Sequence, residues 1–394
     1  MRIVMLVSRV PYPLEKGDKL RAFHQLRHLA QRHEVHLFAL NDGGELHPEA
    51  LSVLGKHCAS VEVVDLPKAR AGLNLARAGL TGKPFQVGYF TWGAAQKRFD
   101  ALVQRVQPDH FYCQLIRTAE YVRSYPDVLE TLDYMDAFAK GMDRRLATAR
   151  PHMKLPIALE RRRLIAYERE AFDRFDHHTI ISEQDRDEIP HERRGEIQVV
   201  RNGVDTEFFS PIEREREWDL LFNGNMGYPP NVEAVEFLVG EVLPVVWERR
   251  PQTRLLISGA TPAPRVTALE SDRVKVSGWV DDVRDSYAGA RVNIAPMLIS
   301  IGLQNKLLEA MAMKVPCITT TLANNALGAR PGEEILVGDT PSELADRILE
   351  LLEDPARAEA IGAGGLELVR RSYDWESTTT QLERLMFSGA RVPV

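Results

Sequence analysis

The residues most able to do chemistry lie in "GLQNKLLEAMA", residues 302–312. This segment follows an apolar run and predicts a helix over about residues 303–313, with Gly302, Lys306 and Glu309 on one face at i, i+4 and i+7. Backbone N–H groups at a helix start favour an anion, and Lys306 adds a full positive charge beside them. A diphosphate fits this position, and Glu309 could accept hydrogen bonds from two ribose hydroxyls. The alternative is a solvated Lys306–Glu309 pair on an ordinary amphipathic helix.

A second candidate loop follows a predicted buried strand in "LLFNGNMGYPPN". The strand runs into Gly224, Asn225 and Gly227, and Asn231 is the expected cap of the next helix. Glycines let a backbone approach a phosphate closely. A simple turn after the strand is the alternative interpretation.

A third loop, "RVPYPLEKGDKLR", follows the first predicted strand of the chain. Gly17 and Asp18 open a helix whose first turn carries Lys19 and Arg21, again cations at the positive end of a helix dipole. A charged turn facing solvent is the alternative. Because two helix starts carry such cations, the pattern favours a shared anion, with these four residues on its phosphate or acceptor side.

Short apolar runs rich in β-branched residues must position these loops, and they alternate with longer amphipathic segments along the whole chain. This is the pattern of βαβ units on a parallel sheet. The runs of the first half are "RIVMLVS", "EVHLFAL", "VEVVDL", "HFYCQL", "VLETLDY" and "HHTIIS", and those of the second half are "WDLLFNG", "TRLLISG", "VKVSGWV", "VNIAP", "VPCITT" and "EILVGD". The predicted fold class is therefore α/β, with two doubly wound Rossmann-like domains facing a cleft at the carboxyl ends of their strands.

The boundary between the two sets of runs is predicted in "IQVVRNGVDTEFFSPIEREREW", where a strand ends in an Asn-Gly turn and a charged stretch follows Pro211. We expect an N-terminal domain over residues 1–198 and a C-terminal domain over residues 199–375. Residues 376–394 should form a terminal helix that packs back on the N-terminal domain.

The composition is that of a globular protein, because 44% of the 394 residues are apolar and the net charge is -6. It argues against disorder and against nucleic-acid binding. Residues 1–199 carry 30 Lys+Arg against 27 Asp+Glu, which leaves 20 against 29 for the rest when subtracted from totals of 50 and 56. The three cysteines, Cys58, Cys113 and Cys317, form neither a metal-ligand spacing nor a disulfide framework.

No stretch reaches the roughly 20 apolar residues that span a bilayer. The opening "RIVMLVS" is too short for a signal-peptide core. We therefore expect a cytoplasmic protein, or one that sits at the inner face of the cell membrane.

Four motifs together carry a specific resemblance. "NGVDTEFFSP", "FNGNMGYPPN", "VSGWVDDV" and "GLQNKLLEAMAMKVPCITT", in this order and at these spacings, are similar to those of the family-four retaining glycosyltransferases, which have the GT-B fold. The N-terminal "SRVPYPLEKGDKLRAFHQLRHLAQRHEVHLFAL" resembles a subgroup of sugar transferases from bacterial exopolysaccharide clusters. The resemblance covers most of the chain and is strongest over residues 200–375.

The resemblance implies retaining transfer of a sugar from a UDP- or GDP-linked donor to a glycan or lipid-linked acceptor, without a bound metal or another cofactor. The N-terminal domain would bind the acceptor and the C-terminal domain the donor. Glu309 matches the second Glu of the family's Glu-x7-Glu motif and would hold the ribose, while Lys306 would help the diphosphate leave. The other donor-binding residues implied in this way are Gly224, Asn225, Trp279, Val280, Gly302, Leu303, Gln304 and Asn305.

The sequence also departs from the family pattern. The first Glu of the motif falls at Ile301, Asn225 stands where an Arg is common, and the Lys a few residues later is absent. The His-Asp pair that often follows an N-domain strand has no match, and "LDYMD" offers Asp133 and Asp136 as catalytic candidates instead. We expect at least one of these two carboxylates to face the cleft.

No metal site is predicted. Asp185 and Asp187 have Asp-x-Asp spacing, but they follow "IISEQ" and read as the first turn of a helix, where the dipole favours acids. Asp281 and Asp282 likewise read as the start of a helix.

Two further features have weaker interpretations. The neighbours His177 and His178 sit in a predicted strand and fit core or edge positions better than ligand positions. The run "LERRRLIAYEREAFDRF" could touch anionic lipid where a lipid-linked acceptor enters, although its interleaved acids favour a solvated helix face.

Two other functions stay open from the sequence. One is a nucleotide-sugar 2-epimerase, because such enzymes share the fold and the phosphate site at the helix start. The other is a non-catalytic sensor of sugar nucleotides that has kept the pocket but lost turnover.

Overall fold

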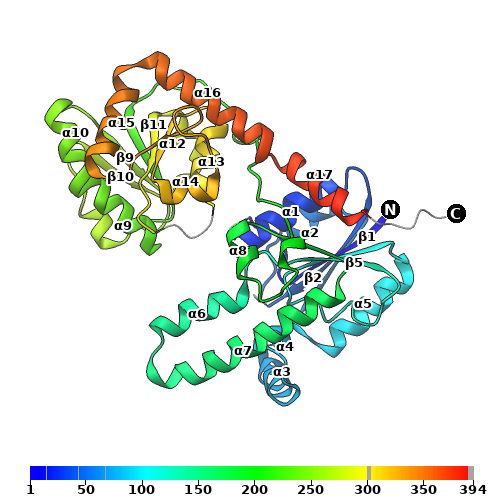
Figure 1. Cartoon of the computed structure of the whole chain (residues 1–394). Helices are drawn as coiled ribbons and strands as arrows, with labels where there is room; N and C mark the ends of the chain where they lie inside the picture. The colour runs from blue at the N-terminus through cyan, green and yellow to red at the C-terminus, as the bar shows by residue number, and fades with distance from the viewer. Residues whose placement is uncertain (15, 43, 67, 300–302, 389–394) are drawn as a thin grey trace. The chain divides into compact units, whose positions relative to one another are not determined.

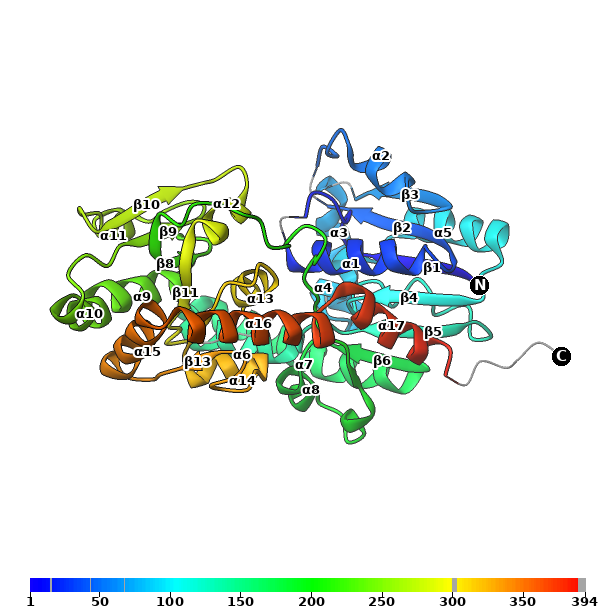
Figure 2. The same ribbon diagram turned by 90° about the horizontal axis from the view of Figure 1, so that it is seen from above.

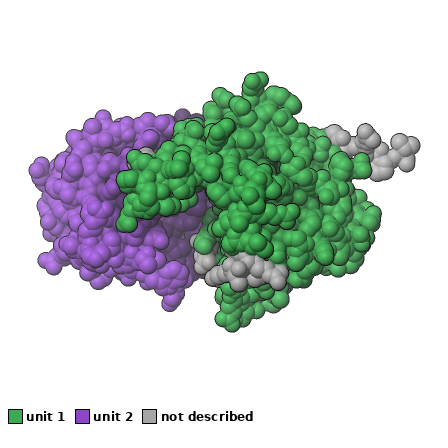
Figure 3. Space-filling view, turned by 90° about the horizontal axis from the view of Figure 1, so that it is seen from below, with its two compact units in different colours: residues 1–202, 375–394 green, residues 203–374 purple. Residues whose placement is uncertain are grey.

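The computed structural model describes the chain except for residues 15, 43, 67, 300–302 and 389–394 (Figure 1; Figure 2 from above). The described chain divides into two compact units. Unit 1 contains residues 1–202 and 375–394, and unit 2 contains residues 203–374 (Figure 3). Each unit holds one parallel sheet.

The sheet of unit 1 has strand order β3-β2-β1-β4-β5-β6-β7, with all neighbours parallel. Its strands are β1 (Arg2–Val7), β2 (Glu34–Asn41), β3 (Ser60–Asp65), β4 (His110–Gln114), β5 (Leu129–Asp133), β6 (His177–Ile180) and β7 (Gln198–Val199). Side chains alternate between the faces of a strand, so Met5 and Leu6 of β1 lie in two different apolar clusters. Both faces of this sheet are therefore buried, as a parallel sheet requires.

Different helices cover the two faces of this sheet (Figure 2). The Met5 face packs against α1 (Gly17–Leu29), α2 (Ala50–Gly55) and α17 (Trp375–Met386). The Leu6 face packs against α4 (Phe85–Phe90), α5 (Gly93–Val106), α6 (Phe138–Thr148) and α7 (Pro151–Arg174). The remaining helices of unit 1 are α3 (Lys68–Thr81), α8 (Glu183–Glu188) and the short 3-10 helix Arg194–Glu196.

The sheet of unit 2 has strand order β10-β9-β8-β11-β12-β13, again parallel. Its strands are β8 (Trp218–Asn223), β9 (Leu255–Ser258), β10 (Val274–Gly278), β11 (Ala290–Ala295), β12 (Cys317–Thr319) and β13 (Leu336–Val337). Every apolar run that the sequence analysis singled out contains a strand. The predicted α/β class with two doubly wound sheets is therefore confirmed.

The helices of unit 2 begin with a long segment in which α9 (Pro229–Phe237), a π-helical turn (Leu238–Val242) and α10 (Leu243–Arg249) follow without a break. The others are α11 (Pro264–Thr267), α12 (Val283–Ala288), α13 (Asn305–Ala312), α14 (Thr321–Leu327), α15 (Pro341–Glu353) and α16 (Pro355–Ser372). α15 shows how sequence sets a helix start, since Thr340 and Glu343 form a reciprocal capping box before its apolar face begins.

The start of α9 corrects one sequence prediction, because Asn231 does not cap this helix. α9 begins two residues earlier, at Pro229 and Pro230, which fit a first turn where backbone N–H groups need no partner. Its N-cap is Tyr228. The Asn231 side chain is therefore available for contacts elsewhere.

The acidic pairs do lie at helix starts, as predicted. Ser182 caps α8 by accepting from the Asp185 N–H, and Asp282 caps α12 by accepting from the Arg284 N–H. Asp282 also forms an ion pair with Arg284 over 2.5 Å. These carboxylates serve local helix structure.

The terminal helix α17 belongs to unit 1. Leu382 and Met386 pack in the same cluster as α1, and the Trp375 ring stacks on His24 with centroids 4.9 Å apart. Among the residues that the structure describes, none of the helices combines the length and the apolar content needed to cross a membrane.

Candidate functional site

The topology of unit 2 marks one place where a ligand can bind. From β8 the chain proceeds to β9 and β10 on one side, and then to β11, β12 and β13 on the other. In doubly wound sheets ligands bind outside the carboxyl ends of the strands at such a switch point. The loops after β8 and β11 therefore frame the candidate site.

The ends of β8 and β9 approach each other closely at two glycines. A Cβ at Gly259, where φ is +135°, would overlap the carbonyl oxygen of Gly224. A Cβ at Gly224 would lie 2.8 Å from the Asn231 amide nitrogen and 3.2 Å from Lys306 Nζ. Only glycine fits at these positions, so the backbone of the β8 loop lies directly against the lysine.

Lys306 is buried at the start of α13. Its ammonium group donates to Asn231 Oδ1 over 2.6 Å and lies 4.3 Å from the centroid of the Phe222 ring. Asn231 is held in turn, because its amide donates to the Asn225 carbonyl over 3.0 Å. The alternative of a solvated Lys306–Glu309 pair is therefore wrong.

Burial sets the protonation of Lys306. Desolvation disfavours the charged form and lowers the pKa of Lys306 to about 7, although the nearby Glu309 carboxylate opposes this shift. A lysine whose charge is so poorly compensated has a strong electrostatic preference for an anion. The helix start adds to this preference, since the Gln304 side chain makes no capping hydrogen bond to α13.

Glu309 lies one turn further along α13 and is anchored from α12. The Tyr287 hydroxyl donates to Glu309 Oε2 over 2.7 Å and accepts from the Asn223 amide over 2.8 Å. Burial raises the pKa of Glu309. The second carboxylate oxygen, Oε1, has no protein partner among the described residues, so Glu309 can accept a hydrogen bond from a bound hydroxyl.

The other predicted donor-side residues fall at the rim of the same strand ends. Trp279 follows β10 with 74% of its surface exposed, and Val280 is half-buried. Leu303 and Gln304 are half-buried, and Asn305 is exposed as the first residue of α13. Gly302 and Ile301 lie outside the described residues.

Unit 1 has its own cavity, of about 360 Å³, at the carboxyl ends of β1 and β2. Its walls contain the cations Arg9, Lys16 and Lys19, the acids Asp42 and Glu45, and the rings of Tyr12 and His47. The cavity therefore carries charges of both signs. It lies where a ligand of unit 1 is expected, beside the switch point between β1 and β4.

Gly17 and Asp18 open α1 beside this cavity. Gly17 is exposed, and a Cβ there would meet no atom within 4 Å. Asp18 forms an ion pair with Arg9 over 2.7 Å, and its carbonyl accepts from the Gln114 amide over 3.0 Å. Asp18 therefore orders the loop after β1 against the end of β4.

Arg21 and Asp133 are paired in the interior of unit 1, which corrects their prediction as ligand-facing groups. Arg21 Nε donates to Asp133 Oδ2 over 2.6 Å, and both side chains are fully buried. The Tyr112 hydroxyl donates to the same carboxylate oxygen over 2.8 Å, and Arg21 also donates to the Val200 carbonyl over 2.9 Å. Arg21 therefore ties the end of β5 to Val200, just after the last strand of the unit 1 sheet, although 112 positions separate Arg21 from Asp133.

Asp136, the second carboxylate of "LDYMD", is exposed three residues beyond the end of β5. Its backbone N–H donates to the Tyr134 carbonyl over 2.7 Å in a tight turn. Of the two predicted carboxylates, only Asp136 is accessible to a substrate in this structure.

The sequence analysis did not predict the contacts that Asn223, Asn231 and Tyr287 make in the unit 2 site. Asn223 and Asn231 lie in the quoted β8 loop, where two asparagines flanking the glycines were a usable signal. Tyr287 sits inside the short helix "VRDSYA", and nothing in its local pattern indicates contact with Glu309, 22 positions away. The His177 and His178 prediction held, since both lie in β6.

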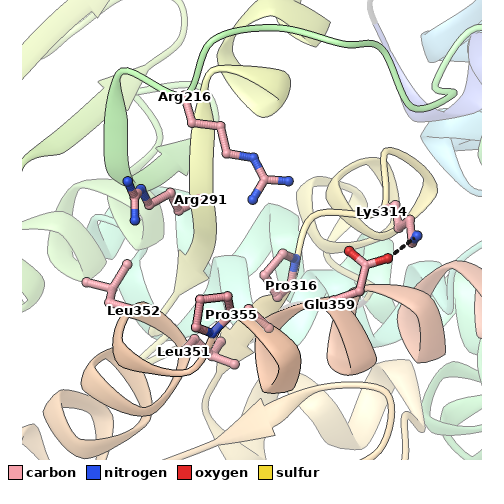
Figure 4. Close-up of a pocket in the computed structure, with 9 residues that line it drawn as sticks. Arg216, Arg291, Lys314, Pro316, Leu351, Leu352, Pro355 and Glu359 are labelled. Carbon is pink, nitrogen blue, oxygen red and sulfur yellow. Dashed lines mark hydrogen bonds and ion pairs between the residues drawn. The ribbon is translucent and has the colours of Figure 1, made fainter.

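Unit 2 has a cavity of about 280 Å³ at the amino ends of β11 and β12 (Figure 4). Arg216 and Arg291 stand on one side of it, opposite Pro316, Leu351 and Pro355. Ligands of such sheets bind at the carboxyl ends of the strands, so this cavity does not belong to the candidate site. Within the part of the chain that the structure describes, no group of three or more His, Cys, Asp or Glu is placed to hold a metal ion.

Comparison with known proteins gives a family match and several relatives. Residues 217–354 match the family model described as glycosyl transferases group 1. An uncharacterized 44.6 kDa protein in the cps region of Klebsiella pneumoniae is 21% identical over 40% of this chain. A GDP-mannose-dependent monoacylated alpha-(1-6)-phosphatidylinositol monomannoside mannosyltransferase of Corynebacterium glutamicum is 29% identical over 38% of this chain. The matches span 42% and 43% of these two relatives, so the chain spans less than half of their length.

Solved structures match over nearly the whole chain. HepE from Anabaena in complex with UDP matches with a TM-score of 0.67 and 14% identity, covering 98% of this chain and all of that one. Sucrose-phosphate synthase from Thermosynechococcus elongatus matches with a TM-score of 0.64 and 17% identity, covering 99% and 100%. At these identities the likeness establishes the fold. Together with the family match, it confirms the resemblance that the motifs indicated.

Proposed function

We propose that this chain, which has the GT-B fold and matches the group 1 glycosyl transferases over residues 217–354, transfers a sugar from a nucleotide diphosphate donor with retention. One observation carries the proposal. At the switch point of unit 2, the buried Lys306 and the helix start of α13 lie directly against the β8 loop, and Glu309 follows one turn later. This spacing matches a diphosphate followed by a ribose.

The residues have separate roles in this proposal. Lys306 and the first N–H groups of α13 bind the diphosphate and stabilise the negative charge that grows on it as the sugar leaves. Glu309, held by Tyr287, accepts hydrogen bonds from the ribose hydroxyls. The exposed Trp279 and the backbone of Val280 lie just after β10, at the rim of the site, and would contact the base of the nucleotide.

Retention follows if the acceptor hydroxyl attacks the face that the diphosphate leaves. A β-phosphate oxygen would then take the acceptor proton, and no carboxylate of the chain is needed as the base. Gly224 and Asn225 contribute backbone beside the diphosphate. Asp136 is the remaining candidate for contact with the sugar or the acceptor.

The acceptor is proposed to bind unit 1 at the cavity lined by Lys16 and Lys19. We propose a glycan or lipid-linked acceptor in surface polysaccharide synthesis, with the protein in the cytoplasm or at the inner face of the cell membrane. The Klebsiella relative from a cps region supports this choice. We propose either UDP or GDP as the nucleotide of the donor, because one similar structure contains UDP and one relative depends on GDP-mannose.

The proposal is tested by nucleotide binding and by turnover. A thermal-shift screen of UDP- and GDP-sugars should find a donor that raises the melting temperature, because it binds only the folded state. Glu309→Ala should then weaken binding of that nucleotide on the order of tenfold or more, since a hydrogen bond to a charged group is worth about 1.5–3 kcal/mol. Asp285→Ala, on the neighbouring helix α12, is the matched control.

Product analysis separates the proposal from its rivals. Donor incubated with a lipid-linked glycan pool should give a glycosylated product whose new bond keeps the donor's anomeric configuration. Formation of an epimeric nucleotide sugar would favour an epimerase. Binding without any turnover, with every acceptor pool tried, would favour a sensor.

A further inference from the structure

We propose that α3 and the α6–α7 hairpin of unit 1 form a docking surface for an anionic lipid bilayer. The surface is called here the basic apolar surface. The inference deepens the proposed function, because a lipid-linked acceptor is held in a bilayer. It rests on separate residues, and bilayer binding needs neither donor nor acceptor.

The first observation is a set of exposed large apolar side chains. Leu80 and Leu73 of α3 are 90% and 72% exposed, and they stand seven residues apart, two turns along one face. Leu155 of α7 is 80% exposed, and Leu159 is exposed one turn further along the same face. Apolar side chains that gather on one region of a surface mark an interaction site, whereas single ones do not.

The exposed apolar side chains of α3 and α7 belong to one region, because a hydrogen bond joins the two helices. Arg163 of α7 donates to the Gly79 carbonyl of α3 over 3.0 Å, and Gly79 is the neighbour of Leu80. Glu160 of α7 also accepts from the N–H of Phe85, the first residue of α4, over 2.7 Å. Figure 1 shows α3 and the α6–α7 hairpin together on the lower side of unit 1, the side that faces the viewer in Figure 3.

The second observation is the charge of these segments. Residues 66–99 contain no Asp or Glu, but they contain Lys68, Arg70, Arg77, Lys83, Lys97 and Arg98. Residues 138–163 contain only Asp143 and Glu160 as acids, against Lys140, Arg144, Arg145, Arg150, Lys154, Arg161, Arg162 and Arg163. This positive charge is local, since the whole chain has a net charge of -6.

Several of these cations are also unpaired. The exposed side chains of Arg77, Arg145, Arg150, Lys154 and Arg162 make no ion pair with any residue in the described part of the chain. Two other cations of these helices are engaged, since Lys140 pairs with Glu188 and Arg161 pairs with Asp143. Unpaired cations around exposed leucines are the composition of an interfacial helix, which buries its apolar side chains among lipid headgroups.

Apart from the buried Glu160, the acids of α7 lie in its other half. Glu168 is buried, and Glu170 pairs with Arg123 over 2.6 Å. The basic apolar surface is therefore confined to the first half of α7, and the sequence run 159–175 overlaps it only at its beginning. The proposed lipid contact is therefore placed on α3, α6 and residues 150–162 rather than on that run.

The test is flotation of the full-length protein with vesicles of phosphatidylcholine, alone or mixed with phosphatidylglycerol. The protein should float with the mixed vesicles at low salt and remain in solution with phosphatidylcholine alone. The triple variant Leu73→Ser, Leu80→Ser, Leu155→Ser should lower partition at least tenfold, because each leucine contributes apolar area to the contact. Arg150→Gln, Lys154→Gln, Arg162→Gln should lower it by a similar factor.

The matched control carries the same kinds of change on the other face of the sheet. Leu51→Ser with Lys56→Gln removes an exposed leucine and an exposed lysine at α2, which packs in the opposite apolar cluster. It should float like the unchanged protein. Thermal melting and nucleotide binding of each variant report whether it is folded.

Three outcomes would overturn the proposal. One is the absence of flotation with anionic vesicles by a folded, nucleotide-binding protein. Another is an equal loss of flotation in the α2 control. The third is tight binding of duplex DNA that depends on the three cations and not on the leucines, which would make the surface a nucleic-acid site. A failed transfer assay bears on none of these results.

Discussion

At the scale of single residues, Lys306 has surroundings that disfavour its charge. Its side chain is buried, and its hydrogen-bond partner, the side-chain amide oxygen of Asn231, carries no charge. The pKa of Lys306 is lowered to about 7. An anionic diphosphate beside Nζ would favour the charged form and raise this pKa. Nucleotide binding should therefore take up a proton at pH values above 7.

This uptake predicts a pH dependence of affinity with a definite sign. Below pH 7 Lys306 is already charged, so its contribution to binding is constant there. Above pH 7 the free protein loses the proton, and affinity should fall by up to about tenfold per pH unit. Calorimetric titration of the cognate nucleotide between pH 7 and 9 measures this fall.

The variant Lys306→Arg keeps its charge over the same range and serves as the control, because an Arg is not deprotonated in proteins. Its affinity should be independent of pH above 7, whatever its absolute value. A slope in this variant equal to that of the unchanged protein would assign the proton to another group.

Asp133 and Asp136 should respond differently to removal of their charge. Asp133→Asn leaves Arg21 buried without a counter-charge and should destabilise unit 1 by about 3–5 kcal/mol. Asp136→Asn changes an exposed side chain and should alter stability by no more than about 0.5 kcal/mol. Chemical unfolding of both variants checks this, and equal stabilities would contradict the structural role of the Arg21–Asp133 pair.

At the scale of elements, the approach of β8 and β9 should tolerate no side chain. Gly259→Ala places a methyl group on the Gly224 carbonyl oxygen at a positive φ and should destabilise unit 2 by roughly 2–4 kcal/mol. Gly240→Ala is the matched control, since a Cβ there meets no atom within 4 Å and the residue lies in a helical segment. Thermal unfolding of both is the measurement, and a neutral Gly259→Ala would refute the close approach.

At the scale of the whole molecule, the proposed function assigns neutralisation of the diphosphate to Lys306 and the start of α13, without a metal ion. The carboxylates of Asp185 and Asp282 lie at the starts of α8 and α12, where they serve helix ends. We predict turnover that excess EDTA leaves unchanged. A loss of turnover in EDTA that Mn²⁺ or Mg²⁺ restores would contradict this prediction and the role given to Lys306.

The sequence by itself determined the class of fold, because apolar runs, helix caps and loop glycines are local properties with periods of 2 and 3.6 residues. It also indicated Lys306 and Glu309, because they share one helix face. Tertiary structure alone decided their surroundings, since Asn231 and Tyr287 reach them from distant segments.

The same physical reason explains the corrections. Arg21 looked like an exposed cation at a helix start, because a local pattern cannot show that β5 brings Asp133 beside it from 112 positions away. The exposure of Leu80 and Leu155 could not be predicted from local sequence for the same reason. Whether a side chain is buried, paired or exposed depends on which segments pack against it, and that is decided only when the chain folds.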